Sequence, residues 1–162
     1  MLNVGDTVPD FELPLAFADG KKEKVQFKTL LGKGPVVIAF YPLAFTGVCT
    51  TENCQLRDAQ AHLDHLQATV VGFSADTPHS NAAFAHANRM WHGLYSDANH
   101  EVLDKIWQTM TVGGVARRAK RGWMVVDPHG KVAAKWVSED PAVWSGLEPI
   151  QKALEPFHTH KH

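Results

Sequence analysis

The sequence predicts an α/β fold in which a mostly parallel sheet is covered by helices on both faces. Two continuously apolar runs, 35–41 and 69–74, are rich in β-branched residues, as is typical of buried central strands. The segment between them, from 50 to about 67, changes to a helical period. Its apolar face is formed by Leu56, Ala59, Leu63 and Leu66. Strands that alternate with helices in this way favour parallel pairing.

Both ends of the chain add antiparallel strands. Near the N-terminus, apolar and polar residues alternate on either side of the turn signal Asp19-Gly20, which predicts a β-hairpin. Later, the apolar strand 122–126 is followed by a tight turn at 127–130 and a returning strand at 131–137. This second hairpin makes the sheet mixed. The whole pattern is that of a thioredoxin-like fold, a central mixed sheet flanked by helices, with an N-terminal β-hairpin extension.

Three further helices are expected. The first covers 78 to about 90, because Pro78 is favoured in a first helical turn. The second runs from 100 to about 109. The third runs over 141–154, where the apolar residues fall on one stripe.

Composition limits the number of domains and the kinds of partner. The 162 residues are 44% hydrophobic, so we expect one domain over 1–157 and a flexible, histidine-rich tail over 158–162. The formal net charge of −1 gives no basic field for nucleic acid or anionic lipid. The longest apolar stretch, 35–45, is shorter than the about 20 residues of a membrane span, and the first residues do not resemble a secretory signal. A cytoplasmic protein without nucleic-acid or membrane partners is therefore expected.

The two cysteines, Cys49 and Cys54, favour redox chemistry or metal binding over a disulfide scaffold. Cys49 follows a central strand and falls in the first turn of the next helix. Unpaired backbone N–H groups and the helix dipole favour a thiolate there, and the thiolate is the nucleophile. The alternative is a buried, inert cysteine, which more often lies within a strand or on the apolar stripe of a helix.

A zinc site is a second alternative, because two histidines follow the cysteines. Cys54 and His65 are eleven residues apart on one predicted helix, a rise of about 16 Å. A tetrahedral site cannot span that distance. No metal and no cofactor are therefore expected.

The pattern Pro42-x-x-x-Thr46-x-x-Cys49 resembles the signature of peroxiredoxins, the AhpC/TSA family. Further matches follow the family's order along most of the chain: Gly5-Asp6-x-x-Pro9-Asp10-Phe11-x-Leu13, Glu52, and Arg121-Gly122-Trp123-Met124-Val125-Val126-Asp127. The resemblance implies a thiol peroxidase in which Cys49 is the peroxidatic cysteine.

The same resemblance implies roles for the neighbours of Cys49. Thr46 would hydrogen-bond the thiolate and the peroxide, and Pro42 would shield the thiolate. Arg121 would stabilise the charge that develops on the leaving oxygen, and Glu52 would orient this arginine.

Simpler roles stay open for three of these residues. Thr46 could be a plain helix N-cap, and Glu52 a first-turn acid that favours the dipole. Arg121 could belong to a solvated basic loop together with Arg117, Arg118 and Lys120.

Cys54 follows Cys49 by five residues, a spacing that resembles the PrxQ or bacterioferritin comigratory protein subgroup, in which the second cysteine resolves the sulfenic acid. On an intact helix these positions are about 8–9 Å apart between Cα atoms. A disulfide needs roughly 4.4–6.8 Å, so the first helical turns must unwind. Residues 42–47 and 121–122 also resemble the one-cysteine AhpE type, in which a partner thiol resolves the sulfenic acid.

We therefore expect reduction of hydrogen peroxide and organic hydroperoxides, with an intramolecular disulfide recycled by thioredoxin or a similar dithiol reductant. The alternatives are a one-cysteine peroxiredoxin and a thioredoxin-like disulfide oxidoreductase, although the Cys-x-x-Cys motif of the latter is absent. A monomer or weak homodimer is expected.

Overall fold

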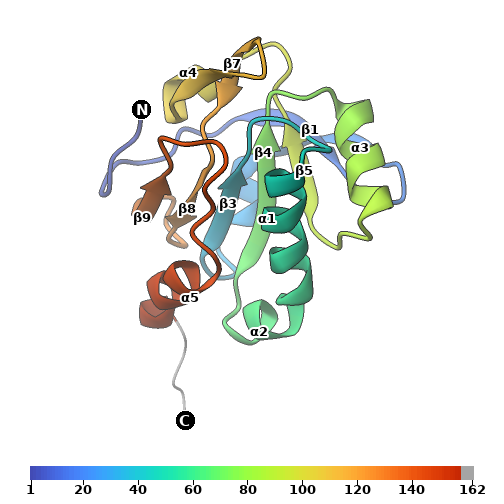
Figure 1. Ribbon diagram of the computed structural model, residues 1–162. Coiled ribbons are helices and arrows are strands. Elements are labelled where there is room, and N and C mark those ends of the chain that lie inside the picture. Colours follow the sequence, from blue (N-terminus) through green and yellow to red (C-terminus); the bar gives the residue numbers. More distant parts are fainter. Residues whose placement is uncertain (158–162) are drawn as a thin grey trace.

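The computed structural model describes residues 1–157, except for the side chains of Val48 and Cys49. Seven strands form one sheet in the order β2-β1-β5-β4-β3-β8-β9 (Figure 1). Their bounds are β1 Glu12–Ala16, β2 Lys22–Gln26, β3 Val36–Phe40, β4 Thr69–Ser74, β5 Gly93–Ser96, β8 Gly122–Val126 and β9 Val132–Val137. A separate hairpin pairs β6 Thr109–Val112 with β7 Val115–Ala119.

The expected thioredoxin-like α/β fold with a mixed sheet is confirmed. The three central strands β3, β4 and β5 are parallel, whereas β8 and β9 join antiparallel beside β3. The N-terminal hairpin β1–β2 joins the other side through antiparallel pairing of β1 with β5. The hairpin is thus continuous with the main sheet.

Successive side chains of β3 point to opposite faces of the sheet, and each face has its own core cluster. Val37 and Ala39 pack under the helices on one face, and Val36, Ile38 and Phe40 belong to the cluster on the other. The helices are α1 Gly47–Asp58, α2 Gln60–His65, α3 Pro78–Ala87, α4 Leu103–Ile106 and α5 Glu148–Leu154, with the short 3₁₀ turns η1 Phe27–Leu30 and η2 Glu155–Phe157. Figure 1 shows α1, α3 and α5 on one side of the sheet. Among the described residues, no helix is long and apolar enough to cross a membrane.

The predicted helix from 50 to 67 was wrong in its continuity. It is interrupted at Ala59 and forms α1 and α2. Leu56 and Leu63, one on each helix, lie in the same core cluster. Its start was also late, because α1 begins at Gly47.

The predicted helix from 100 to 109 was mostly wrong. Only α4 is helical, because the buried carboxylate of Asp97 accepts hydrogen bonds from the backbone N–H groups of residues 101–103 and fixes the segment before it. Residues 109–112 pair as a strand, which suits their β-branched side chains.

The predicted helix over 141–154 is reduced to α5. Gly146 adopts a left-handed backbone with a φ of 79°, which interrupts helical geometry before Glu148. The expected tail, 158–162, lies outside the described residues.

Gly122 leaves room for a tryptophan at the start of β8. The Trp107 ring stacks on Phe40 with centroids 3.9 Å apart, and its Nε1 donates to the Lys120 carbonyl at 2.7 Å. A Cβ at Gly122 would overlap the Trp136 carbonyl oxygen and lie 2.7 Å from the Trp107 ring. Glycine here therefore allows the strand after Arg121 to pack.

We predict that Gly122→Ala lowers the free energy of unfolding by about 1–3 kcal/mol or more, because a backbone carbonyl cannot move aside as a side chain can. Denaturation in urea measures it. As a control, Ala134→Gly in β9, opposite Val125, should cost only about 0.5–1 kcal/mol, the ordinary preference for alanine in a strand. Wild-type stability of Gly122→Ala would contradict the packing argument.

Candidate active site

The segment that carries the predicted nucleophile runs from the end of β3 into α1. Thr46 has an extended backbone and precedes the helix, and its carbonyl accepts the first helical hydrogen bond from the Thr50 N–H at 2.9 Å. The backbone of Cys49 therefore lies in the first turn of α1, as expected; its side chain lies outside the described part. Unpaired N–H groups and the dipole of a first turn favour an anion.

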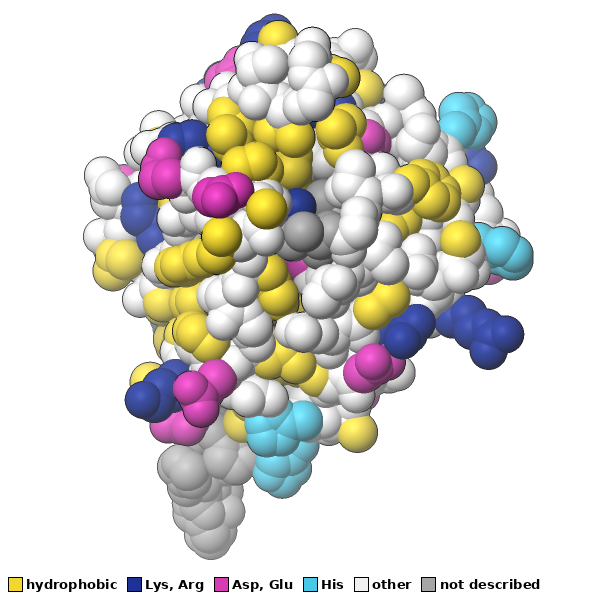
Figure 2. Space-filling model, viewed as in Figure 1, with side chains coloured by type: hydrophobic (Ala, Val, Ile, Leu, Met, Phe, Trp, Pro, Cys, Tyr) yellow, Lys and Arg dark blue, Asp and Glu magenta, His cyan; other side chains and the backbone are white. Residues whose placement is uncertain are grey.

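A pocket of about 300 Å3 opens at this helix start. It is lined by Pro42, Thr46, Gly47, Val112, Arg121, Pro141 and Ala142. Three predicted site residues from two distant parts of the chain thus meet in one place. Figure 2 shows dark-blue and magenta atoms at the bottom of a hollow edged by apolar side chains on this face.

The Thr46 side chain makes no helix-capping hydrogen bond. Its Oγ1 donates instead to the Leu43 carbonyl at 3.0 Å, within the loop that precedes the helix. The hydroxyl is at the surface and beside the pocket. The simple N-cap interpretation therefore does not describe this side chain.

Arg121 is buried, with 1% of its surface exposed, and its guanidinium is held from two directions. Nη1 donates to Glu52 Oε1 at 2.6 Å, and Nε donates to the Pro141 carbonyl at 2.8 Å. These bonds fix the plane of the guanidinium at the wall of the pocket.

Glu52 is completely buried on α1, and its Oε2 has no hydrogen-bond partner among the described residues. Burial raises the pKa of this carboxyl above its ordinary value, because the loss of water outweighs the attraction and the hydrogen bond of Arg121. A carboxyl that holds its proton more readily leaves more of the positive charge of Arg121 acting on the pocket. Glu52 thus contacts the arginine directly and does not serve only the helix dipole.

The other basic residues near Arg121 have different surroundings. Arg117 pairs with Asp104 at the surface, and Lys120 pairs with Glu139 at 2.7 Å. Arg118 is buried, but it lies behind the loop between β3 and α1, residues 41–46, which we call the active-site loop. Of these four residues, Arg121 is the one that lines the pocket.

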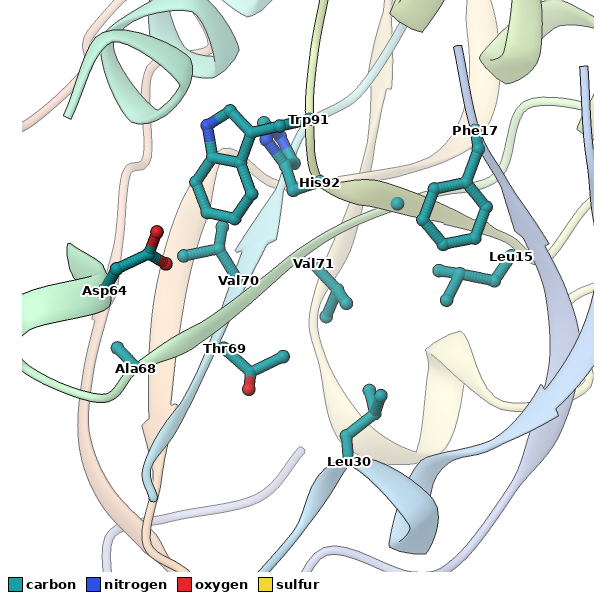
Figure 3. Close-up of a pocket in the computed structure, with 11 residues that line it drawn as sticks. Leu15, Phe17, Leu30, Asp64, Ala68, Thr69, Val70, Val71, Trp91 and His92 are labelled. Carbon is teal, nitrogen blue, oxygen red and sulfur yellow. The ribbon is translucent and has the colours of Figure 1, made fainter. Parts of the chain in front are cut away.

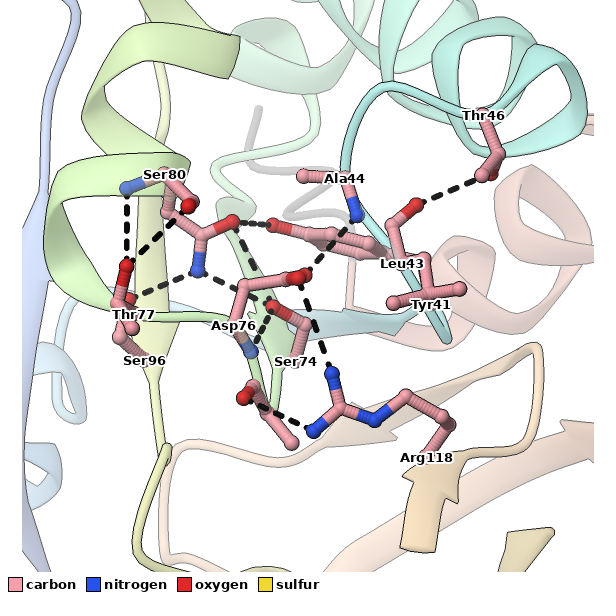
Figure 4. A network of polar contacts seen from close by, with 12 residues as sticks. Tyr41, Leu43, Ala44, Thr46, Ser74, Asp76, Thr77, Ser80, Ser96 and Arg118 are labelled. Atoms are coloured by element: carbon pink, nitrogen blue, oxygen red, sulfur yellow. Dashed lines mark hydrogen bonds and ion pairs between the residues drawn. The ribbon is translucent and has the colours of Figure 1, made fainter. Parts of the chain in front are cut away.

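Asp76 lies just after the end of β4 and supports the active-site loop through a hydrogen bond. The sequence did not predict this role. Its Oδ2 accepts from the Ala44 N–H at 3.0 Å, and its Oδ1 lies 3.8 Å from Arg118 Nη1 (Figure 4). Arg118 Nη2 also donates to the Ala75 carbonyl at 3.1 Å. The only sequence signal was the place of Asp76 just after a buried strand, at the edge of the sheet where sites form.

The loop also contains a strained residue. Phe45 has a φ of 67°, in the left-handed region, and is 57% exposed. Its ring contacts Phe84 of α3 edge-to-face, with centroids 5.2 Å apart. Backbone strain of this kind persists where neighbouring contacts fix the loop.

Cys54 is half-buried and points toward α3. Its Sγ lies 3.6 Å from Asn88 Oδ1, at the end of that helix. Because α1 is continuous from Gly47 to Asp58, positions 49 and 54 are separated by about 8–9 Å along regular helical geometry. Resolution by Cys54 stays a prediction, and it requires part of α1 to unwind.

No metal centre is formed by the described residues, among which no three His, Cys, Asp or Glu side chains gather. His65 also falls on α2, beyond the break at Ala59.

We predict that Glu52→Ala lowers the free energy of unfolding by about 3 kcal/mol, because it removes the carboxyl partner of a buried guanidinium. Glu52→Gln keeps an acceptor for Nη1 and should cost about 1 kcal/mol. Chemical denaturation measures both. Glu139→Ala, which removes an exposed partner of Lys120, is the control and should change stability by about 0–1 kcal/mol. Equal losses for Glu52→Ala and Glu139→Ala would contradict this account.

Comparison with known proteins agrees with the fold and identifies the family. The model of the AhpC/TSA family matches residues 4–135. Peroxiredoxin Bcp of Escherichia coli is 31% identical over 134 residues, covering 81% of this chain and 83% of that protein. The chloroplastic 2-Cys peroxiredoxin BAS1 of Arabidopsis thaliana is 32% identical, covering 94% and 68%.

Among solved structures, peroxidoxin BcpB of Mycobacterium tuberculosis aligns over 100% of both chains, with a TM-score of 0.82 and 32% identity. The expected likeness to the bacterioferritin comigratory protein subgroup is confirmed by these relatives. The chain therefore belongs to the AhpC/TSA family and is a peroxiredoxin, a peroxidase of the oxidoreductase class.

Proposed function

We propose that Cys49 reduces hydrogen peroxide and organic hydroperoxides, that Cys54 resolves the product as an intramolecular disulfide, and that thioredoxin or a similar dithiol recycles it. The observation that carries the proposal is the meeting of Pro42, Thr46 and Arg121 in one pocket, at the first turn of the helix that carries Cys49. We also propose a cytoplasmic location and a monomer or weak homodimer.

The first step is attack of the Cys49 thiolate on one peroxide oxygen. The S–O bond forms as the O–O bond breaks, and the leaving oxygen takes up a proton to become water or an alcohol. Arg121, with its plane fixed by Glu52 and Pro141, offers donors to the oxygen on which charge develops. The Thr46 hydroxyl needs only to rotate away from the Leu43 carbonyl to donate into the pocket.

The second step forms the Cys49–Cys54 bond and releases water from the sulfenic acid. The continuous helix α1 keeps the two positions beyond disulfide distance, so unwinding must come first. An external dithiol then exchanges with the disulfide and returns both thiols.

The main alternative is a one-cysteine cycle in which a partner thiol attacks the sulfenic acid. The contact of Cys54 with Asn88, away from the pocket lining, favours this alternative. A thioredoxin-like disulfide oxidoreductase is a weaker one, and insulin reduction without peroxide consumption would indicate it.

We predict that Arg121→Ala slows sulfenate formation about 10²- to 10³-fold, because a preorganised donor is lost. Cys49→Ser should abolish peroxide consumption. Rapid-quench trapping of the sulfenic acid measures the first step, and circular dichroism checks the fold. Arg117→Ala removes an exposed arginine and should react as wild type. Retained turnover in Cys49→Ser, or equal rates for the two arginine variants, would overturn the assignment.

We predict that one equivalent of peroxide without reductant lowers the intact mass by two hydrogens, because Cys54 closes a disulfide. In Cys54→Ser the mass should increase by one oxygen instead, and cycling with thioredoxin should stop. An oxygen gain in the wild-type protein would mean that Cys54 does not resolve, and the one-cysteine alternative would replace it.

A further inference from the structure

A buried polar pair joins α1 to the segment before β5, between the positions of the two cysteines. Asn53 lies on α1 and His92 directly before β5, and their exposed fractions are 0% and 2%. His92 Nε2 lies 3.2 Å from Asn53 Oδ1. Figure 3 shows His92 beside Trp91 at the wall of a second pocket, which shares no lining residue with the active-site pocket.

The chemical groups of the pair determine which one donates the hydrogen bond. Asn53 Oδ1 can only accept, so the hydrogen is on His92 Nε2. Burial lowers the pKa of His92 to about 4, so the ring is neutral near pH 7. His92 Nδ1 has no partner among the described residues, which is costly in the interior. An apolar pair would avoid that cost, so stability alone does not account for this polar pair.

Asn53 lies between Cys49 and Cys54 on α1, so its bond to His92 affects the approach of the two cysteines. A disulfide between Cys49 and Cys54 requires the helix between them to unwind, and Asn53 lies inside that stretch. The bond to His92 must therefore break before the sulfur atoms meet. The weak contact of Cys54 Sγ with Asn88 Oδ1, at 3.6 Å, must break as well.

The bond from Arg121 Nη1 to Glu52 Oε1, at 2.6 Å, also lies within the unwinding stretch, whereas two further contacts to α1 lie beyond it. Trp91 Nε1 donates to the Arg57 carbonyl at 3.0 Å, and Arg57 Nη1 donates to the Asn88 carbonyl at 2.7 Å. These bonds can persist while residues 49–54 rearrange. Neighbouring residues of one segment, Trp91 and His92, thus hold different parts of α1.

We propose that His92 is a positioning residue that holds α1 in its helical state through Asn53 and thereby sets the rate at which Cys54 reaches the oxidised Cys49. The proposal rests on the two-cysteine cycle proposed above. Loss of the bond makes unwinding easier but leaves the pocket intact, so the two chemical steps respond differently.

The test compares His92→Phe and Asn53→Leu with wild type in rapid-quench experiments that time sulfenate and disulfide formation separately. Disulfide formation should accelerate about 3- to 10-fold, the range expected for one buried hydrogen bond, while sulfenate formation stays within about twofold. His92→Gln, which retains a donor, should restore the wild-type disulfide rate. Trp91→Phe is the matched control, and its disulfide rate should match wild type.

Hydrogen exchange of the reduced proteins separates this proposal from the proposed function. The amides of residues 50–54 should exchange about 3- to 10-fold faster in His92→Phe and Asn53→Leu, whether or not Cys54 resolves. Faster exchange in these variants, together with a wild-type protein that forms no disulfide, would overturn only the two-cysteine cycle. An unchanged or slower disulfide step with unchanged exchange, or equal acceleration in Trp91→Phe, would overturn the role of His92.

Discussion

The buried pair of Arg121 and Glu52 is the constraint on which the active site depends. It joins the residue before β8 to the second turn of α1, with 2% and 0% of the two side chains exposed. Neither group can lose the other without leaving a polar group unsatisfied in the interior. The pair therefore sets the distance between the helix start that carries Cys49 and the opposite wall of the pocket. The Pro141 carbonyl accepts from Nε of the guanidinium, and glycine at 122 allows the strand after Arg121 to pack closely against Trp107 and the Trp136 carbonyl.

The sequence predicted those parts of the fold that local patterns encode. The strands at 36–40 and 69–74 are apolar on both faces because both faces are buried, and this made them recognisable. The four residues of β5 have no such pattern, and it was missed. The ends of helices were wrong where one distant contact decides them, as the Asp97 carboxylate does before α4.

In the site, too, residues that belong to local sequence patterns were predicted, and those that depend on distant contacts were not. Pro42 and Thr46 were predicted from a fixed spacing to Cys49, and Arg121 from its place directly before an apolar strand, as in the family it resembles. The structure places the three around one pocket. Asp76 was not predicted, because its bond to the Ala44 N–H joins residues 32 positions apart and no local sequence pattern indicates such a contact. Arg118 resembles a solvated loop residue in the sequence, yet it is 9% exposed and lies behind that loop.

In the proposed two-cysteine cycle, helix α1 must be stable when reduced and must unwind when oxidised, and its contacts divide accordingly. Beyond Cys54 it is fastened from two sides by indole groups, with Trp144 Nε1 donating to Gln55 Oε1 at 2.8 Å and Trp91 Nε1 to the Arg57 carbonyl. Between the cysteines, Glu52 Oε1 accepts from Arg121 Nη1 and Asn53 Oδ1 accepts from His92 Nε2. Unwinding that stops at the tryptophans exposes little of the core, because Leu56 stays in place. The free energy of the rearrangement then depends on the polar contacts of residues 52 and 53, which is why single substitutions there can change the rate of one step.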